Sequence, residues 1–487
     1  MTPFLQQVAT AFYRQYGTEI QHLAFVFPNR RAGLFFRKYL ARAAGKPLFA
    51  PAVLTISGLF FQLSGKQPAD RIRLLFLLYR IYIRHSGREE AFDDFVYWGE
   101  MLLNDFDDVD KYLVDARRLF TNITDLHDLE AHFDYLNESQ LTAIRSFWSS
   151  FRAEGKNASQ QYFLKIWQLL YAVYVELRET LAAEGIGYEG MIFREVTERI
   201  RREGGCELPY RRIVFVGLNA LTAAEKDLMT LLQQQGIADF YWDYPSAMVK
   251  DPDNKASFFS EDNLTRFPPA LTLPAEEEET MPEIELIGIP SRIGQAKQVY
   301  PLLKEMLGER PAIDTEEALR TAIVLPDEQL LIPVLHAIPE EIARINVTLG
   351  YPLSGAPVAS LMESALALQK NLRVTDGEGA GFNYRETLAV LNHPYVASAC
   401  REAVSDLVRE ITLNNKIRVT AQEAGRTPLL ALIFSPVQEA DALSDYLIAV
   451  LQELNRAMTS LTPERDEDGA VCMDELEQEF IFHYFTT

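Results

Sequence analysis

Asn29, Arg30 and Arg31 are the residues best placed for chemistry, because they lie where an apolar run meets an amphipathic segment in FVFPNRRAGLFFRKYL, residues 25–40. This pattern predicts a strand followed directly by a helix, with both arginines at the corner. Arginine suits phosphate because its planar group offers paired N–H donors. The corner is therefore a candidate anion site, although two adjacent helical positions cannot point the same way.

The charge around this corner differs from the charge of the whole chain. Residues 1–60 carry seven Lys and Arg side chains against one acid, Glu19, whereas the 487-residue chain has a formal net charge of −22. The seven cations are Arg14, Arg30, Arg31, Arg37, Lys38, Arg42 and Lys46. The net charge disfavours a nucleic-acid partner, but its distribution allows a local basic surface. A solvated helix face is the alternative interpretation.

Short apolar runs alternate with longer amphipathic segments along the chain. Most runs are continuous rather than alternating, which is typical of parallel strands covered on both faces. Strands are predicted at residues 23–27, 53–56, 213–216, 240–242, 284–289 and 322–325. Residues 66–200 and those after about 375 have helical periodicity, and 250–282 is typical of a linker. The fold class is therefore α/β, with a doubly wound pattern that occurs twice.

Composition limits the class of protein. A prior of about 150 residues per domain suggests roughly three domains, and 48% hydrophobic residues can fill sizeable cores. Neither a membrane-spanning run nor an amino-terminal leader is recognisable, so we expect a cytoplasmic protein. Cys206, Cys400 and Cys472 are far apart and form no CxxC pair, which argues against a zinc site or a disulfide framework.

The motifs of ATP hydrolysis are not found. A P-loop requires GxxxxGK[ST], and no Gly-Lys pair fits that spacing. The run VGLNALTAAEKDLM has Gly217 and Asn219 where carboxylates would be needed to hold a metal-bound water. We therefore do not expect ATP or Mg²⁺ as cofactors of this chain, and we predict no catalytic residues in it.

Other candidate sites have simpler interpretations. The acidic FDDVDK, residues 106–111, lacks the alternation and glycine of a calcium loop, so we expect a solvated helix start. The fragments EGK, residues 154–156, and DNK, residues 253–255, lie in turn-like composition and do not predict a nuclease site. His393 precedes a proline in LNHPYV and is expected to shape a helix end.

A family resemblance covers essentially the whole chain. It is carried by FVFPNRRAGLFFRKYL, LTISGLF, WGEMLLNDFDDVDKYLVDARRLF, IVFVGLNALTAAEKDLM, FYWDYP, IPSRIGQAKQV and AIVLPDEQLLIPVLHAIPEEIARINVTLGYPLSGAPVASLM. In this order the segments resemble the inactivated superfamily-one helicase region of AddB/RexB-like proteins. These proteins are subunits of RecBCD-type helicase-nucleases, here in the form found with PD-(D/E)XK exonucleases of Bacteroidetes. The resemblance is most specific in INVTLGYPL and WGEMLLNDFDDVDKYLVDA.

The resemblance implies an architecture of two RecA-like, P-loop NTPase-type parallel-sheet domains with large helical insertions. The first RecA-like domain would comprise residues 1–65 and 205–282, with a helical insertion at 66–204. The second would comprise 283–375, and 376–487 would begin a second helical insertion. The family pattern places a nuclease domain downstream, and the final DELEQEFIFHYFTT has no terminating glycine or proline, so we expect the chain to be part of a longer protein.

The resemblance also implies functional residues. The residues aligned with DNA-contacting motifs are Asn29, Arg30, Arg31, Thr55, Ser57, Asn346 and Thr348. Arg292 and Gln295 fall near the interdomain nucleotide-binding motif of the family. At these two residues, and at Gly217 and Asn219, the nucleotide-binding motifs are degenerate, so we expect no nucleotide to bind there. Asn29 and Ser57 also occupy positions typical of helix N-caps, and Asn346 has a simple alternative role in supporting a turn before Gly350.

The expected function is DNA binding by a catalytically inactive, helicase-like region of an AddB-type subunit that acts in DNA repair and recombination. Its partners would be single-stranded or end DNA and a RecB/AddA-like helicase-nuclease subunit, with no membrane partner. Enzymatic activity would belong to the parent exonuclease rather than to this chain. Two alternatives stay open: an ATPase with an unconventional phosphate loop, and a scaffold without DNA binding whose acidic helical insertion docks a partner.

Overall fold

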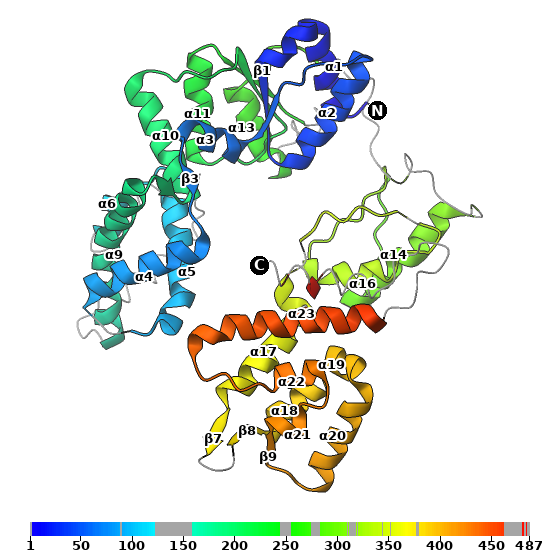
Figure 1. The fold of residues 1–487 in the computed structure, drawn as a ribbon. Helices are drawn as coiled ribbons and strands as arrows, with labels where there is room; N and C mark the ends of the chain where they lie inside the picture. The colour runs from blue at the N-terminus through cyan, green and yellow to red at the C-terminus, as the bar shows by residue number, and fades with distance from the viewer. Residues whose placement is uncertain are drawn as a thin grey trace. The chain divides into compact units, whose positions relative to one another are not determined.

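The computed structural model in Figure 1 describes residues 2–87, 90–121, 158–243, 255–273, 283–308, 310, 318, 320–342, 344–350, 352–375, 379–461, 480, 481 and 484. The chain divides into two compact units, Met1–Pro282 and Glu283–Thr487. Within the described part of the chain, no helix is both long enough and apolar enough to cross a membrane.

A parallel four-stranded sheet forms the centre of the first unit. Its strands are β1 (Leu23–Phe27), β2 (Ala52–Thr55), β5 (Arg212–Val216) and β6 (Ala238–Tyr241), in the order β2-β1-β5-β6. All five residues of β1 are buried, as expected for a continuous apolar run covered on both faces. The second predicted strand lies one residue earlier than expected, because Ile56 begins the next helix. The α/β class and the parallel sheet are thus confirmed for this unit.

Helices cover both faces of this sheet. On one face, α1 (Phe4–Tyr16) and α2 (Arg30–Ala44) pack against Phe25 and Phe27 of β1. On the other face, α3 (Ile56–Ser64), α10 (Glu189–Glu203) and α11 (Ala223–Gln234) pack against Val26, which points the opposite way. Successive strand residues therefore supply two separate cores. The remaining elements here are η1 (Gly17–His22), η3 (Lys255–Ser257) and α13 (Phe258–Arg266).

Two chain segments that pair with each other connect the helical insertion to the sheet domain. They are the short parallel strands β3 (Gln67–Pro68) and β4 (Ile186–Gly187). Between them lie α4 (Arg71–Ser86), α5 (Phe92–Lys111), α6 (Ala116–Thr121) and α9 (Ala158–Ala183), which share a core of their own. The helix after β4, α10, contacts both α3 of the sheet domain and α5 of the insertion.

The predicted FDDVDK helix start is wrong, since these residues form the last turns of α5. Asp110 within them is completely buried rather than solvated. Sequence composition alone did not indicate this burial.

The second unit differs more from the sequence prediction. Its described elements begin with α14 (Arg292–Leu307), η4 (Glu328–Leu330), α16 (Leu331–Leu335) and η5 (Leu353–Gly355). The strands predicted at 284–289 and 322–325 are not formed: neither segment belongs to a sheet among the described residues. Leu286 and Val324 in these segments are strongly exposed. An apolar run becomes a strand only where a neighbour completes its hydrogen bonds, and no such neighbour lies in this described region.

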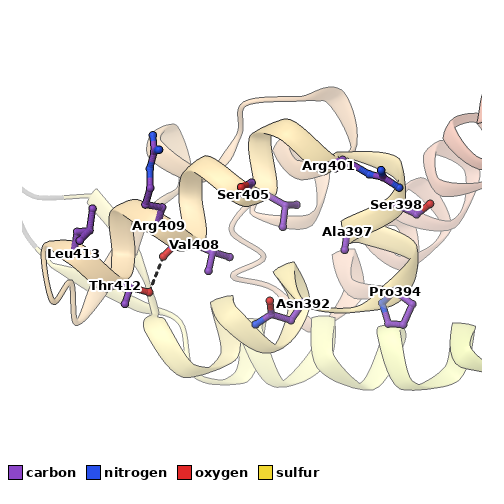
Figure 2. Close-up of a pocket in the computed structure, with 11 residues that line it drawn as sticks. Asn392, Pro394, Ala397, Ser398, Arg401, Ser405, Val408, Arg409, Thr412 and Leu413 are labelled. Atoms are coloured by element: carbon purple, nitrogen blue, oxygen red, sulfur yellow. Dashed lines mark hydrogen bonds between the residues drawn. The ribbon is translucent and has the colours of Figure 1, made fainter.

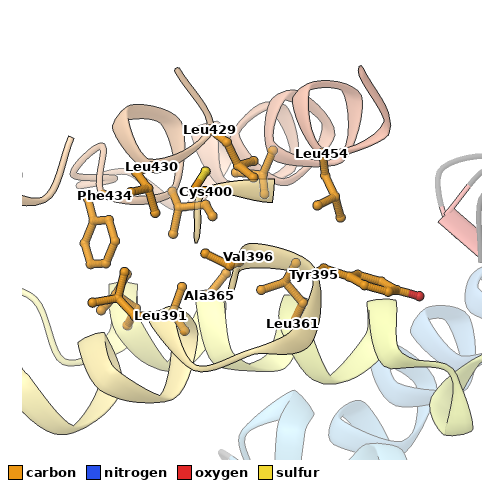
Figure 3. Close-up of a cluster of buried hydrophobic side chains, with 14 of the residues drawn as sticks. Leu361, Ala365, Leu391, Tyr395, Val396, Cys400, Leu429, Leu430, Phe434 and Leu454 are labelled. Atoms are coloured by element: carbon orange, nitrogen blue, oxygen red, sulfur yellow. The ribbon is translucent and has the colours of Figure 1, made fainter. Parts of the chain in front are cut away.

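A compact helical domain follows. Its elements are α17 (Pro357–Lys370), β7 (Arg373–Thr375), β8 (Gly379–Asn383), α18 (Tyr384–Leu391), α19 (Pro394–Ala399), α20 (Arg401–Leu413), β9 (Arg418–Thr420), α21 (Ala421–Ala424), α22 (Pro428–Ile433), η6 (Ala440–Ala442) and α23 (Leu443–Leu461). The strands β7, β8 and β9 form an antiparallel sheet that begins before residue 376. Figure 3 shows Leu361 and Ala365 of α17 in the same core as Leu430 and Phe434. This core therefore extends across the domain boundary expected at residue 375.

Candidate nucleic-acid interface

The predicted corner residues lie at the carboxyl edge of the parallel sheet. Register pairs Phe27 with Thr55 and Val216 with Tyr241, so all four strands end at this edge. The chain moves from β1 to β2 on one side and later to β5 on the other side of β1. Ligands of open α/β sheets bind at such a switch point, outside the carboxyl ends of the strands. The corner after β1 occupies this position.

Asn29 caps the helix that carries the two arginines. Its Oδ1 accepts a hydrogen bond of 2.9 Å from the Ala32 N–H, and its backbone is extended. The helix-cap role that the sequence left open for Asn29 is therefore its structural role. Only Pro28 and Asn29 separate β1 from α2. Because the P-loop consensus spans about eight residues, this corner does not have P-loop geometry.

A basic face runs along the exposed side of α2. It consists of Arg30, Arg31, Arg37, Lys38 and Arg42. These positions recur at spacings of four, seven and eight residues, which places them on one side of a helix. All five are exposed, and α2 contains no acidic residue. The face is about 18 Å long at about 1.5 Å per residue.

Four cations of the basic face are available for a ligand. Among the described residues, no carboxylate forms an ion pair with Arg30, Arg31, Arg37 or Lys38. Most other cations of the first unit are neutralised; Lys66, for example, lies 2.6 Å from Glu195. The basic face therefore keeps its positive charge in a strongly acidic chain.

Gly33 fixes which side of α2 faces solvent. A Cβ at this position would lie 2.5 Å from Cγ1 of Val53 in β2, so only glycine allows this close approach. Gly33, Phe36 and Leu40 are buried toward the sheet. The opposite side, with the arginines, is consequently held outward.

Thr55 and Ser57 have structural partners of their own. Thr55 caps α3, because its Oγ1 accepts a hydrogen bond of 3.1 Å from the Gly58 N–H. The cap of α3 is thus Thr55 and not Ser57. The Ser57 hydroxyl instead donates to Glu189 at the start of α10. Burial raises the pKa of Glu189, but hydrogen bonds from Lys111 and Ser57 outweigh it, so the pKa is lowered.

The end of β5 has neither a free carboxylate nor a phosphate loop. Gly217 has a left-handed backbone, and its N–H donates to the Tyr241 carbonyl at 2.8 Å. The Asn219 carbonyl accepts a hydrogen bond of 2.7 Å from the buried Asn263 side chain. Both residues shape the loop that leads to α11.

The site residues predicted in the second unit are exposed. Asn346 and Thr348 lie in a segment that forms neither helix nor strand. Arg292, in the first turn of α14, forms an ion pair of 2.9 Å with Asp327. The Gln295 side chain donates to the Ile289 carbonyl at 3.3 Å. Arg292 and Gln295 therefore organise the start of α14.

A serine and a histidine of the second unit resemble a nucleophile and its base. Ser360 Oγ lies 3.0 Å from His393 Nε2. However, the Tyr395 N–H donates to His393 Nδ1 at 3.3 Å, so the ring proton is on Nε2 and points toward the Pro357 carbonyl, 3.1 Å away. The neutral ring has no lone pair left to accept the serine proton. His393 caps α19, as the sequence predicted for it.

The second unit also has a hollow alongside α20, shown in Figure 2. This groove of about 730 Å³ is lined by α20, α19 and the end of α18. Arg401 and Arg409 lie toward opposite ends, with Ser405 and Val408 between them. Arg409 is paired with Asp406 at 3.4 Å, which lowers its capacity to attract an anion. The basic face of α2 is therefore the more strongly cationic surface.

No group of three or more metal-ligating side chains is found among the described residues. No family model and no curated protein matches the sequence. The assignment of the site consequently rests on geometry and charge.

The sequence identified Arg30 and Arg31 as site residues but did not assign Arg37, Lys38 or Arg42 to the site, although their helical spacing was a usable signal.

Proposed function

We propose that this chain binds single-stranded DNA along the basic face of α2 and the adjoining corner at Asn29. The observation that carries the proposal is a set of exposed cations on one helix face at the switch point of a parallel sheet. Four of them, Arg30, Arg31, Arg37 and Lys38, have no carboxylate partner in the described residues. Phosphate groups are the anions that such spaced guanidinium and ammonium groups bind.

The charge distribution supports attraction of DNA to the basic face of α2 rather than to the chain as a whole. With a net charge of −22, the chain as a whole repels a polyanion. Beyond a Debye length of about 10 Å that repulsion is largely screened at moderate salt, so contacts along α2 decide binding. The amino ends of α2, α3 and α11 lie at the same sheet edge and add their partial positive charge.

In the wider proposal, the chain is the catalytically inactive, helicase-like DNA-holding part of an AddB-type subunit in DNA repair and recombination. A partner helicase would supply ATP-driven movement, and nuclease activity would belong to another part of the assembly. The resemblance of the sequence to AddB/RexB-like proteins motivates this proposal. The two-residue connection between β1 and α2 is consistent with a protein that holds DNA without hydrolysing ATP at this corner.

The test is a fluorescence-anisotropy titration of a labelled single-stranded oligonucleotide with the full chain at low salt. We expect saturable binding that Arg30→Ala with Arg31→Ala weakens about tenfold or more. A matched control, Arg409→Ala with Arg456→Ala, removes two exposed arginines of the second unit and should leave the affinity nearly unchanged. Absence of binding, or equal weakening by the control, would contradict the proposal.

The same titration with ATP present separates this function from an ATPase. The affinity for DNA should not change with ATP, and phosphate release should stay at the background rate. Turnover that is abolished by a substitution at the β1–α2 corner would support an unconventional ATPase instead.

A further inference from the structure

Four large apolar side chains are exposed on two neighbouring helices of the insertion. On α5, Tyr97 and Met101 are 79% and 56% exposed; on α4, Ile72 and Phe76 are 64% and 49% exposed. Each pair is four residues apart, so its members lie on the same face of their helix. We call these four residues the α5 patch. Large apolar side chains exposed on helices that contact each other are candidates for an interaction surface.

Side-chain contacts between α4 and α5 hold the α5 patch in a defined arrangement. Arg71 of α4 forms an ion pair with Glu100 of α5 and donates to Asn104 at 2.8 Å. Further along α4, Phe76 stacks on Phe92 with ring centres 4.2 Å apart. The two helices therefore contact each other at more than one place along their length. The patch is therefore ordered before a partner arrives, which limits the entropy that binding must overcome.

Acidic residues lie at both ends of the exposed face of α5. Asp93 and Asp94 precede Tyr97 by about one turn, and Asp105 and Asp108 follow Met101 by one to two turns. Helical spacing places all four on the same side as Tyr97 and Met101. Among the described residues, none of these four carboxylates has an ion-pair partner. Asp93 and Asp94 also suit the amino end of a helix.

Asp105 and Asp108, which follow Met101 on the exposed face of α5, repel each other. Burial raises the pKa of Asp105, and the negative charge of Asp108 raises it further. A cation placed beside them would relieve this repulsion. The surface thus favours positive charge on both sides of an apolar centre.

We propose that the α5 patch docks a segment of a partner protein that is apolar at its centre and carries Lys or Arg on both sides. Tyr, Phe and Met are enriched in protein interfaces, and an amphipathic helix or strand of the partner would cover them. The flanking carboxylates would repel DNA and anionic lipid, which leaves a cationic protein segment as the complementary ligand. This surface is separate from the basic face of α2, so the inference does not depend on the proposed function.

The test uses the full chain and a fluorescein-labelled amphipathic peptide with leucines on one helical face and lysines at both ends. Saturable binding is expected, and Tyr97→Ala with Met101→Ala should weaken it about tenfold or more. Asp105→Asn with Asp108→Asn should also weaken binding. The control Glu402→Gln with Asp406→Asn removes the same charge from exposed positions of α20 and should have little effect.

Three outcomes would overturn the proposal. The first is unchanged peptide binding by the Tyr97→Ala, Met101→Ala variant with an unaltered circular dichroism spectrum. The second is equal weakening by the α20 control, which would indicate attraction to net charge only. The third is a light-scattering mass that rises with concentration in the unaltered chain but not in this variant, which would assign the patch to a second copy of the chain.

Discussion

Asp110 of α5 and Arg194 of α10 form a buried ion pair, with 2.6 Å between Asp110 Oδ1 and Arg194 Nε. The hydroxyls of Tyr174 and Tyr188 also donate to this carboxylate, each at 2.5 Å. Arg194 in turn donates to the carbonyls of Val109 and Val114, both at 2.7 Å. The group joins the helical insertion to the helix that covers the sheet. These hydrogen bonds depend on geometry that only the folded chain provides.

Replacing Asp110 should therefore be costly. In Asp110→Asn, Arg194 keeps its buried charge but loses its buried counter-charge and retains only the more exposed Glu198 at 3.6 Å. We expect a loss of about 3 kcal/mol in the free energy of unfolding. Urea denaturation followed by circular dichroism measures this. The matched substitution Asp406→Asn breaks an exposed pair of 3.4 Å with Arg409 and should change the midpoint very little. Similar midpoints for the two variants would contradict a stabilising role for the buried group.

Asn29 offers a way to separate helix capping from DNA contact. Asn29→Ala removes the acceptor for the Ala32 N–H and should cost about 1 kcal/mol of stability. Asn29→Asp keeps a good cap but adds a negative charge beside Arg30 and Arg31. We expect this variant to unfold like the unaltered chain in a thermal melt and to bind oligonucleotide several-fold more weakly. Unweakened binding by Asn29→Asp would remove the corner from the interface.

The number of phosphate contacts along α2 can be counted from salt dependence. For single strands, the slope of log K against log salt concentration changes by about 0.7 per phosphate contact. If Arg37 and Lys38 both contact phosphate, Arg37→Ala with Lys38→Ala should make the slope shallower by about 1.4. Titrations at four or more salt concentrations give this value. A slope that does not change would confine the interface to the first turn of α2.

Gly33 should be intolerant of alanine although it lies inside a helix. Gly-to-Ala changes in helices normally gain about 1 kcal/mol, but here the added Cβ would lie 2.5 Å from Val53 Cγ1. Overpacking of this kind costs about 1–3 kcal/mol, so a net loss of stability is expected in Gly33→Ala. The second substitution Val53→Ala removes the clashing methyl group and should recover part of the loss. A stabilised Gly33→Ala variant would show that α2 can move away from β2.

His393 should make the second unit less stable in mild acid. Burial lowers the pKa of His393, while its hydrogen bond to the Pro357 carbonyl opposes this effect. Below the ordinary histidine pKa of about 6.5, the unfolded chain takes up a proton that the folded chain resists. This contribution to stability is therefore complete above about pH 6.5 and is lost as the pH falls toward the lowered pKa.

The substitution His393→Asn isolates this effect. Asparagine can still cap α19 but does not titrate, so the variant should lose less stability than the unaltered chain between about pH 7.5 and pH 5.5. Urea midpoints at several pH values in this range provide the comparison. Parallel pH profiles for the two proteins would assign the acid sensitivity to other groups.

The sequence by itself determined the elements whose signals are local. Continuous apolar runs located β1 and β5, and a polar residue before an amphipathic segment indicated the caps Asn29 and His393. For α3 the same signal indicated Ser57, whereas the cap is Thr55. These signals suffice because a strand covered on both faces must be apolar throughout and because a cap bonds to an amide only two or three residues away. The cations of α2 were also readable from the sequence, since their spacing follows the helical repeat.

The tertiary structure alone decided the features that depend on distant partners. Asp110 lies in an acidic run that is typical of a solvated helix, yet Arg194, Tyr174 and Tyr188 come from elements far along the chain to bury it. Likewise, the apolar run at 284–289 predicted a strand, but strand formation requires a neighbour that the run does not specify. Whether a charge is buried, or an apolar run paired, is set by contacts between segments, and composition along one segment contains no record of them.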